Sequence, residues 1–302
     1  MGICCKPIQS ADSMGMRLLL ETCGFAGFLA KPFDFRGLNR FCKIAGRTSH
    51  GSAIVKFHPD VMLRVHSSDP YWLSVASRAR RYEAEVESVL ERFRHEPMTF
   101  IDGGANVGYW SIFAAKRFGW RVAAIEAGRA TFKRLSENVA LNQVNVTLLH
   151  NAVSDVGSRQ VSFVTVSGHH AGAHIADVPA EGVGVEAVVT ISVDELAATH
   201  HLTDAIILKL DVEGYELPAL KGARRVLQGR ALAIYEEHGS RRSCEPTQML
   251  LADGFDVFFM EADSLVPVRS VADVAARMSN EHRGYNLLAT RSKAMTERLL
   301  SR

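Results

Sequence analysis

The sequence has few cysteines, and they follow no metal-binding pattern. The 302 residues include an odd set of five that lacks the spacing of a zinc site: Cys4, Cys5, Cys23, Cys42 and Cys244. An odd set is also unlike the paired disulfides of a small secreted domain. We therefore expect reduced thiols and a cytoplasmic protein.

A long apolar run is also absent. A membrane-spanning helix needs about 18 or more apolar residues in succession, and the best candidate, residues 14–30, contains Arg17, Glu21 and several glycines. At the N-terminus, Gly2 is followed by Lys6 where a myristoylation signal has serine or threonine. We expect an ordinary N-terminal sequence, with neither secretion nor a membrane span.

A strong net charge is the third feature that the sequence lacks. The net charge of +2 at pH 7 is too small to indicate a nucleic-acid partner. With 47% apolar and 23% charged residues, the composition is that of a globular protein with a large core. Residues 17–64 are locally basic, with eight Lys or Arg against three acidic residues. This basic region indicates either peripheral contact with an anionic membrane or lipid-linked sugar, or a solvated basic face.

Apolar strand-like segments alternate with helix-like segments from about residue 97 onward. Predicted helices cover residues 109–118 and 131–142, and a third has Pro218 in its first turn and stops at Gly229. Near-continuous apolar strands separated by helices are typical of a parallel sheet covered on both faces. We therefore predict an α/β fold with a doubly wound, mostly parallel sheet over residues 97–291. The predicted strands are residues 99–104, 121–127, 145–153, 205–211, 231–237, 255–260 and 285–290.

The segments around this alternation complete the predicted domain organisation. The last two strands are joined by an irregular link, residues 261–284, which predicts an antiparallel edge. Residues 1–96 are predicted to form a cap that contains a hairpin over residues 52–66 and a helix over residues 81–93. Residues 292–302 are predicted to be a C-terminal tail.

Acidic residues end almost every predicted strand. In an open α/β sheet, ligands bind beyond the carboxyl ends of the strands, near the point where the strand order reverses. Five acidic strand ends at one edge are hard to explain as solvated loops, so we expect a binding site there. The residues concerned are Asp102, Glu126, Asp155, Asp211 with Glu213, and Glu236 with Glu237 and His238.

The glycine-rich stretch FIDGGANVGYW, residues 100–110, follows the first strand of this sheet. It is not a dinucleotide fingerprint, because Asn106 stands where a glycine is needed, and it lacks the lysine of a phosphate loop. Asp102 would also repel a phosphate. Glu126, 24 residues after Asp102, can accept hydrogen bonds from two ribose hydroxyls. A ligand with a ribose and a cationic end but no phosphate fits these residues, and S-adenosylmethionine is such a ligand.

The sequence resembles the FkbM family of S-adenosylmethionine-dependent methyltransferases over roughly residues 80–290. Residues 102–108 match the family's Asp-x-Gly-Ala-Asn-x-Gly turn, and LKLDVEGYELPALKGA, residues 208–223, matches its Lys-x-Asp-x-Glu-Gly pattern. Ala127 stands where a proline is usual, and Ser192-Val193 replaces Thr-Leu, but neither departure removes a charged group. Further matches are Glu126, Asn138 and residues 151–155, 192–196 and 235–238.

This resemblance implies a class I, Rossmann-like methyltransferase fold and S-adenosylmethionine as the cofactor. The cofactor-binding residues predicted in this way are Asp102, Gly103, Gly104, Asn106, Gly108, Glu126 and Asp155. It also implies an O-methyltransferase that acts on a hydroxyl, of a sugar in a glycan, glycolipid or glycosylated metabolite. The alternative is a protein that binds S-adenosylmethionine without turnover, or another nucleotide-dependent enzyme.

Methyl transfer to a hydroxyl calls for a base that accepts its proton. The predicted catalytic residues are Asp211, Glu213 and His238. Asp211 and Glu213 are separated by one residue, so both would point to the same side of an extended strand end. Each also has a structural interpretation: Asp211 and Glu213 as shaping or helix-capping carboxylates, and His238 as a loop histidine. For Glu237 we prefer a structural or orienting role.

A metal site and a mobile loop are the remaining hypotheses. Asp211, Glu213, Glu237 and His238 could bind a hard cation together with waters. The resemblance implies no metal, and we predict none. The stretch GHHAGAH, residues 168–174, is predicted to be a mobile loop over the site, and His169, His170 and His174 are candidates for contact with the substrate.

Overall fold

The computed structural model divides the chain into two compact units. The larger unit comprises Glu83–Leu135 and Asn145–Arg302, and the smaller one comprises Met1–Tyr82 and Ser136–Val144. Helix α6, Arg129–Asn142, therefore contributes residues to both units. The structure describes residues 6–29, 37–47, 50–77, 81–166, 169–176, 184–202, 205–239, 243–262, 264–280 and 283–301.

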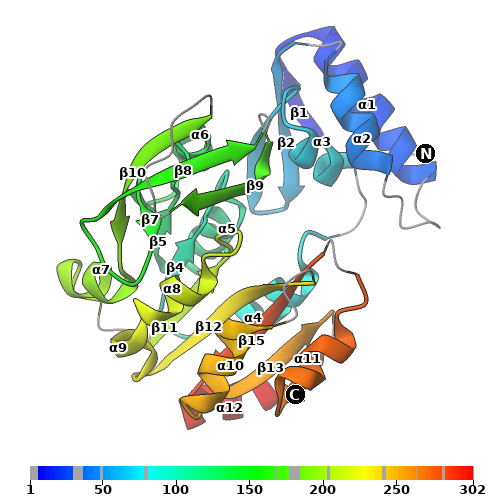
Figure 1. The fold of residues 1–302 in the computed structure, drawn as a ribbon. Helices are drawn as coiled ribbons and strands as arrows, with labels where there is room; N and C mark the ends of the chain where they lie inside the picture. Colours follow the sequence, from blue (N-terminus) through cyan, green and yellow to red (C-terminus); the bar gives the residue numbers. More distant parts are fainter. Residues whose placement is uncertain are drawn as a thin grey trace. The chain divides into compact units, whose positions relative to one another are not determined.

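The larger unit is built on an eight-stranded sheet with the order β14-β13-β15-β12-β11-β4-β5-β6 (Figure 1). Five neighbouring strands are parallel: β12 (Ala231–His238), β11 (Ala205–Leu210), β4 (Met98–Gly103), β5 (Arg121–Ile125) and β6 (Thr147–Leu149). The chain runs outward from β4 through β5 to β6 and then returns to the other side of β4 with β11 and β12. The strand order therefore reverses between β4 and β11, which is where ligands bind in such sheets.

Three antiparallel strands extend the sheet beyond β12. They are β15 (Gly284–Thr290), β13 (Asp256–Glu261) and β14 (Ser264–Val268). The predicted strands at residues 255–260 and 285–290 are antiparallel as expected. However, the link predicted to be irregular was wrong, because it contains the edge strand β14 and helix α11 (Val271–Arg277), which begins with a Ser270–Asp273 capping box.

Helices surround the sheet, and the sheet core is mostly apolar. Every residue of β4 and β11 is buried, as expected for strands with both faces covered. The doubly wound α/β prediction is therefore confirmed. The helices of the larger unit besides α6 and α11 are α4 (Ala84–Arg92), α5 (Tyr109–Phe118), α7 (Val193–Thr199), α8 (Glu216–Lys221), α9 (Arg224–Leu227), α10 (Glu245–Ala252) and α12 (Lys293–Leu300).

Two predicted elements are divided in the structure. The third strand, predicted over residues 145–153, splits into β6 of the large sheet and β7 (Ala152–Val153), which pairs with β10 (Val185–Ile191) instead. The single helix predicted before Gly229 is split into α8 and α9. Its interruption lies at Gly222, where the backbone packs so closely that an added Cβ would lie 2.0 Å from the Ser154 carbonyl oxygen.

A second, four-stranded sheet has the order β7-β10-β8-β9. In it, β8 (Gln160–Val166) pairs antiparallel with both β10 and β9 (His169–Ala176). The prediction of a mobile loop over residues 168–174 was therefore wrong from His169 onward, because this backbone is paired with β8. The side chains of the three histidines lie outside the described residues.

The smaller unit combines a three-stranded sheet with helices. The sheet has the order β1 (Ile8–Ala11), β2 (Ser52–His58), β3 (Val61–His66), and the predicted hairpin over residues 52–66 is confirmed as β2 and β3. Helices α1 (Met14–Leu29) and α2 (Gly37–Gly46) both pack against α3 (Pro70–Ser77).

Side chains of α6 satisfy the open edge of β3. Asn142 accepts a hydrogen bond from the Met62 backbone N–H at 3.0 Å and donates one to the Met62 carbonyl at 2.6 Å. Asn138 accepts from the Arg64 backbone N–H at 2.8 Å. Both asparagines are buried, so the family-like Asn138 has a structural role: it covers a strand edge that would otherwise be unpaired.

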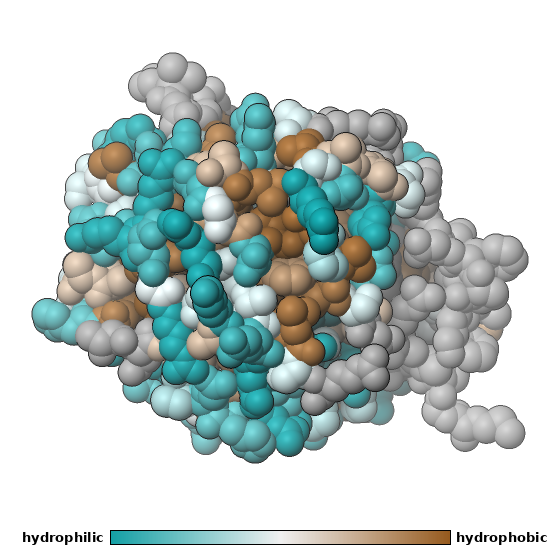
Figure 2. Space-filling view, turned by 90° about the horizontal axis from the view of Figure 1, so that it is seen from below, coloured by the Kyte–Doolittle hydropathy of each residue, from teal (hydrophilic) through white to brown (hydrophobic). Residues whose placement is uncertain are grey.

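The surface is mostly hydrophilic on the face shown in Figure 2, where apolar side chains gather in one area near the middle. Within the described residues, no helix is long and apolar enough to cross a membrane.

Candidate functional site

The glycine turn between β4 and α5 is held tightly against the neighbouring strand ends. Gly104, Asn106 and Gly108 all have left-handed backbones, with φ of 78°, 51° and 94°. The backbone N–H groups of Gly104 and Ala105 both donate to the Ile125 carbonyl at 2.9 Å. A Cβ on Gly104 would lie 1.9 Å from the carbonyl oxygen of Asp211. The turn therefore joins the end of β4 to the ends of β5 and β11.

Glu126 fixes the same turn from the end of β5. Its carboxylate accepts the backbone N–H of Asn106 at 2.9 Å on one oxygen and that of Gly128 at 2.8 Å on the other. Burial raises the pKa of this carboxyl to about 7, although these two hydrogen bonds oppose the shift. The structure thus places Glu126 at the glycine turn, where the sequence analysis expected it.

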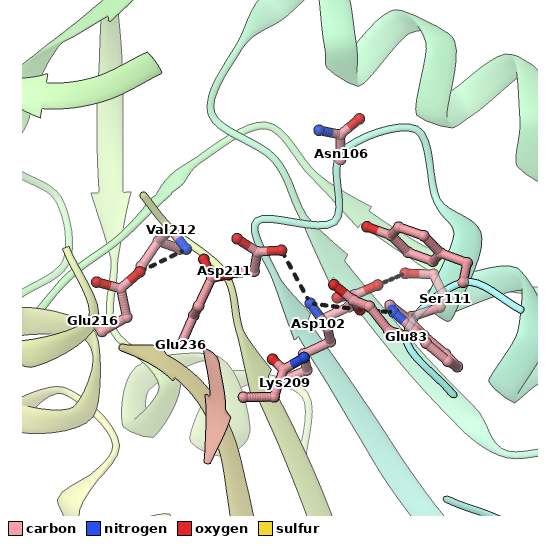
Figure 3. A network of polar contacts seen from close by, with 12 residues as sticks. Glu83, Asp102, Asn106, Ser111, Lys209, Asp211, Val212, Glu216 and Glu236 are labelled. Atoms are coloured by element: carbon pink, nitrogen blue, oxygen red, sulfur yellow. Dashed lines mark hydrogen bonds and ion pairs between the residues drawn. The ribbon is translucent and has the colours of Figure 1, made fainter. Parts of the chain in front are cut away.

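A buried ammonium organises the carboxylates between β4 and β11 (Figure 3). Lys209 lies with its Nζ 3.3 Å from Asp211 Oδ2 and 3.9 Å from Glu83 Oε2. Although burial opposes the charged form, Asp211, Glu83 and Asp102 raise the pKa of Lys209. The Lys209 side chain is only 4% exposed, so this charge depends on its acidic neighbours.

Two of these acidic neighbours are themselves held by hydrogen bonds. Asp102 accepts the Ser111 hydroxyl at 2.6 Å, and Glu83 accepts the Trp110 indole N–H at 2.6 Å. Burial raises the pKa of Asp102, and it raises that of Glu83 to about 7. Ser111 and Trp110 both lie in the first turn of α5, so this helix and the glycine turn before it orient the buried acids.

The loop after β11 is a turn, not an extended strand end. Glu213 and Gly214 have left-handed backbones, with φ of 51° and 93°. Glu216 accepts the backbone N–H groups of Val212 at 3.2 Å and Gly214 at 3.1 Å, which closes the turn. The prediction that Asp211 and Glu213 share one side of an extended strand was therefore wrong. Glu216, which the sequence analysis gave no role, therefore stabilises this loop.

The two acids at the end of β12, Glu236 and Glu237, have different partners. Glu236 Oε2 lies 3.3 Å from His238 Nε2, and its carboxylate crosses Gly284, where an added Cβ would lie 1.4 Å from Glu236 Oε1. Burial raises the pKa of Glu236 well above its ordinary value, with Asp211 and Glu83 adding to the effect. Glu237 instead accepts the backbone N–H and hydroxyl of Thr247 at 3.0 and 2.7 Å, in agreement with the structural role expected for it.

Asp155 is more exposed than Asp102 and Glu126 and has other partners. It follows β7, is 41% exposed, accepts the Ser154 hydroxyl at 2.9 Å and pairs with Arg159 at 3.6 Å. Across the described ranges, no three His, Cys, Asp or Glu side chains come together as a metal site.

A separate hollow of about 270 Å³ lies between α8, α9 and α10. Gln228 precedes β12, Phe255 precedes β13 and Arg291 follows the antiparallel β15, so this hollow opens at the amino ends of the parallel strands. It is therefore at the opposite edge of the sheet from the glycine turn and the carboxylates.

The sequence analysis missed three residues of this site: Glu83, Lys209 and Glu236. Lys209 carried a signal, because a single charge inside the apolar strand AIILKLD must find buried partners. Glu236 was noted as a strand end but given no role, and Glu83 precedes the domain predicted from residue 97.

A doubly wound α/β sheet with a glycine turn at the point of strand reversal is the architecture of the class I, Rossmann-like methyltransferases. A family model described as the methyltransferase FkbM domain matches residues 102–285. The chain therefore belongs to the FkbM methyltransferase family.

Individual known proteins are similar to parts of the chain. The hexuronic acid methyltransferase AglP of Haloferax volcanii is 31% identical over 177 residues, which cover 57% of this chain and 70% of AglP. The structure of M. jannaschii TYW2 in complex with AdoMet aligns at a TM-score of 0.40 and 12% identity, over 80% of this chain and 85% of that one. The Pyrococcus abyssi tRNA (uracil-54, C5)-methyltransferase in complex with S-adenosyl-L-homocysteine aligns at 0.43 and 15% identity, over 79% and 43%.

Replacing Gly104 by alanine should be strongly destabilising. The new Cβ would meet the Asp211 carbonyl oxygen at 1.9 Å in a left-handed backbone, so either β11 or the turn must move. We expect a loss of at least about 3 kcal/mol in the free energy of unfolding. Gly119→Ala is the matched control: Gly119 is also left-handed, at φ 69°, but its Cβ would meet nothing within 4 Å. Denaturant titration should give a loss of only about 1 kcal/mol for it, and equal losses would contradict close packing at Gly104.

The raised pKa of Glu126 should make part of the stability pH-dependent. Its carboxyl titrates near 4.5 when unfolded and near 7 when folded, so its ionisation disfavours the fold. This contribution is absent below about pH 4.5, grows as pH rises and is complete above about pH 7. Relative to wild type, Glu126→Gln should gain roughly 2–3 kcal/mol of unfolding free energy between pH 5 and 8. A difference that stays constant over this range would show that Glu126 is already ionised at pH 5.

Proposed function

We propose that this methyltransferase uses S-adenosylmethionine and methylates a hydroxyl, of a sugar in a glycan, glycolipid or glycosylated metabolite. The observation that supports this most directly is the set of carboxylates around the glycine turn at the ends of β4, β5, β11 and β12. Such surroundings attract a cation and repel a phosphate.

The residues at the turn fit this cofactor. Each oxygen of Glu126 accepts one backbone N–H, and a carboxylate has about four acceptor sites, so it retains capacity for two ribose hydroxyls. The bound cofactor supplies a methyl group on a sulfonium cation, for which Asp102 and Asp211 provide opposite charge. The proposed cofactor contacts are Asp102, Gly103, Gly104, Asn106, Gly108, Glu126 and Asp155, the last of which is accessible at 41% exposure.

The same charges favour a neutral hydroxyl over a carboxylate as the acceptor. Glu236 is surrounded by the charges of Asp211, Glu83 and Glu213, and the nearby cation, Lys209, is already paired. These carboxylates would repel the carboxylate of an acceptor, whereas an acceptor hydroxyl can donate a hydrogen bond to one of them. AglP is named for a hexuronic acid, a type of sugar that carries both hydroxyls and a carboxylate. For such a sugar, the acidic cluster of the present chain would favour a hydroxyl as the acceptor.

We assign the acceptance of the hydroxyl proton to Asp211. Its backbone packs against Gly104, so it stands beside the glycine turn, and Lys209 donates to its Oδ2 and fixes its orientation. Glu213 is assigned to orienting the acceptor. His238, which lies 3.3 Å from Glu236, is the next candidate for the base.

A label-transfer experiment tests the function. With S-adenosylmethionine labelled in its methyl group, we expect label on neutral glycosides, and we expect that it survives mild alkali because methyl ethers do. Label lost in alkali would indicate a methyl ester and overturn the hydroxyl assignment. Calorimetry should show binding of S-adenosylhomocysteine but not of NAD or ATP, and binding of NAD alone would overturn the cofactor assignment.

Two variants should separate cofactor binding from proton transfer. Asp211→Asn should bind the cofactor within a few-fold of wild type but lose about 10²–10⁴ in kcat, the range for a lost general base. Glu126→Ala should weaken cofactor binding by roughly ten- to hundred-fold, because charge-assisted hydrogen bonds are worth about 1.5–3 kcal/mol.

The controls for this pair are Glu297→Ala, at an exposed position of α12, and Glu213→Gln. The first should match wild type in both measurements. The second should mainly raise KM for the acceptor. If Asp211→Asn and Glu213→Gln both turn over normally, the base lies elsewhere and His238→Gln is the variant to measure.

A further inference from the structure

Helices α1 and α2 of the smaller unit hold most of the large apolar side chains that the described surface exposes. Eight such residues are exposed, and five of them lie on these two helices. The five are Met14 at 87% exposure, Leu18 at 62%, Phe25 at 51%, Phe41 at 36% and Ile44 at 59%. Large apolar side chains gathered in this way indicate an interaction surface, whereas single ones do not.

On α1 the exposed apolar residues share one side of the helix. Met14, Leu18 and Phe25 are separated by four and seven residues, which places them in one row. Met16 and Cys23, on the other side, are fully buried. The buried side thus packs within the unit, whereas Met14, Leu18 and Phe25 each remain more than half exposed.

On α2 the exposed apolar residues stand among basic ones. Phe41 and Ile44 lie three residues apart, and Leu38 and Cys42 form the buried side. Arg40 and Arg47 are exposed, and Lys43 is partly exposed. On α1, Arg17 is exposed and pairs with Glu21 at 3.2 Å. Within the two helices, three basic residues and one acidic residue therefore accompany the apolar side chains, and Arg47 follows α2 directly.

Apolar and basic residues together specify the kind of partner. An apolar row alone would suit another protein as well as a lipid surface. An excess of Lys and Arg beside it matches the negative headgroups of anionic lipids. As far as the structure describes them, neither helix is long and apolar enough to cross a membrane, so the contact would be made in the plane of the headgroups. In Figure 1, α1 and α2 run beside one another, and both pack against α3, so they can act together.

We propose that the exposed sides of α1 and α2 bind an anionic lipid surface, with Met14, Leu18, Phe25, Phe41 and Ile44 inserted among the headgroups and Arg40, Lys43 and Arg47 facing the lipid charges. This inference does not depend on the methyltransferase site. It adds a location to the proposed function, because a glycolipid acceptor would be presented at the same surface.

Vesicle co-sedimentation of the full chain, without cofactor or acceptor, tests the proposal. We expect binding to phosphatidylcholine vesicles that contain phosphatidylglycerol, weaker binding without it, and release as salt is raised, because salt screens the charges. Leu18→Ser, Phe25→Ser and Ile44→Ser combined should reduce binding at least tenfold, as should Arg40→Gln, Lys43→Gln and Arg47→Gln combined.

The matched control removes exposed apolar residues of the larger unit. Val156→Ser with Val189→Ser changes side chains that are 56% and 49% exposed, and it should bind vesicles as wild type does. Unchanged unfolding temperatures and S-adenosylhomocysteine affinity show that each variant is folded. The proposal is overturned if wild type binds neither kind of vesicle, or if the control loses binding to the same extent. It is also overturned if the α1 and α2 variants abolish a dimer seen by sedimentation velocity while vesicle binding persists.

Discussion

The candidate site depends on one buried ammonium. Lys209 is almost inaccessible to solvent in the middle of the sheet, and its charge is tolerated because Asp211, Glu83 and Asp102 surround it. Conversely, these acids can lie so close together only because Lys209 is among them. Removing one partner of a buried ion pair costs about 3–5 kcal/mol, since the other charge is left uncompensated. The acidity of the site and the stability of the sheet therefore rest on the same residue.

The glycine turn connects the buried acids around Lys209 to the edge of the sheet where a ligand is expected to bind. The Asp211 carbonyl presses on Gly104, Glu126 holds the turn from β5, and Ser111 and Trp110 of α5 orient the acids beneath it. Each strand end is thus tied to the next by a short polar or steric contact. A site assembled in this way is pre-organised, which is what placing an acceptor hydroxyl beside a methyl donor requires.

Periodicity and strand-end residues were enough to predict the parallel sheet, the hairpin and the places of Asp102, Glu126 and Asp211 at neighbouring strand ends. What failed depended on contacts between distant segments. Residues 168–174 look like a loop because of their glycines and histidines, but pairing with β8 makes the backbone a strand from His169 onward. The one-residue spacing of Asp211 and Glu213 is that of a strand. However, backbone hydrogen bonds from Val212 and Gly214 to Glu216 make this segment a turn. In the sequence, Glu83 looks like an ordinary acid before a helix. Its role depends on contacts with Lys209 and Trp110, which are distant in the chain.

The crossing of Glu236 over Gly284 links two positions that lie 48 residues apart in the chain. The side chain at 284 decides how much room the carboxylate at 236 has, since any Cβ there would take the space of its oxygen. Across related chains, the two positions should therefore change together. Glutamate at 236 in this orientation requires glycine at 284, and a larger residue at 284 should accompany a shorter or reoriented one at 236. The residues at positions 236 and 284 of a relative would then show whether it keeps the Glu236 carboxylate in this orientation.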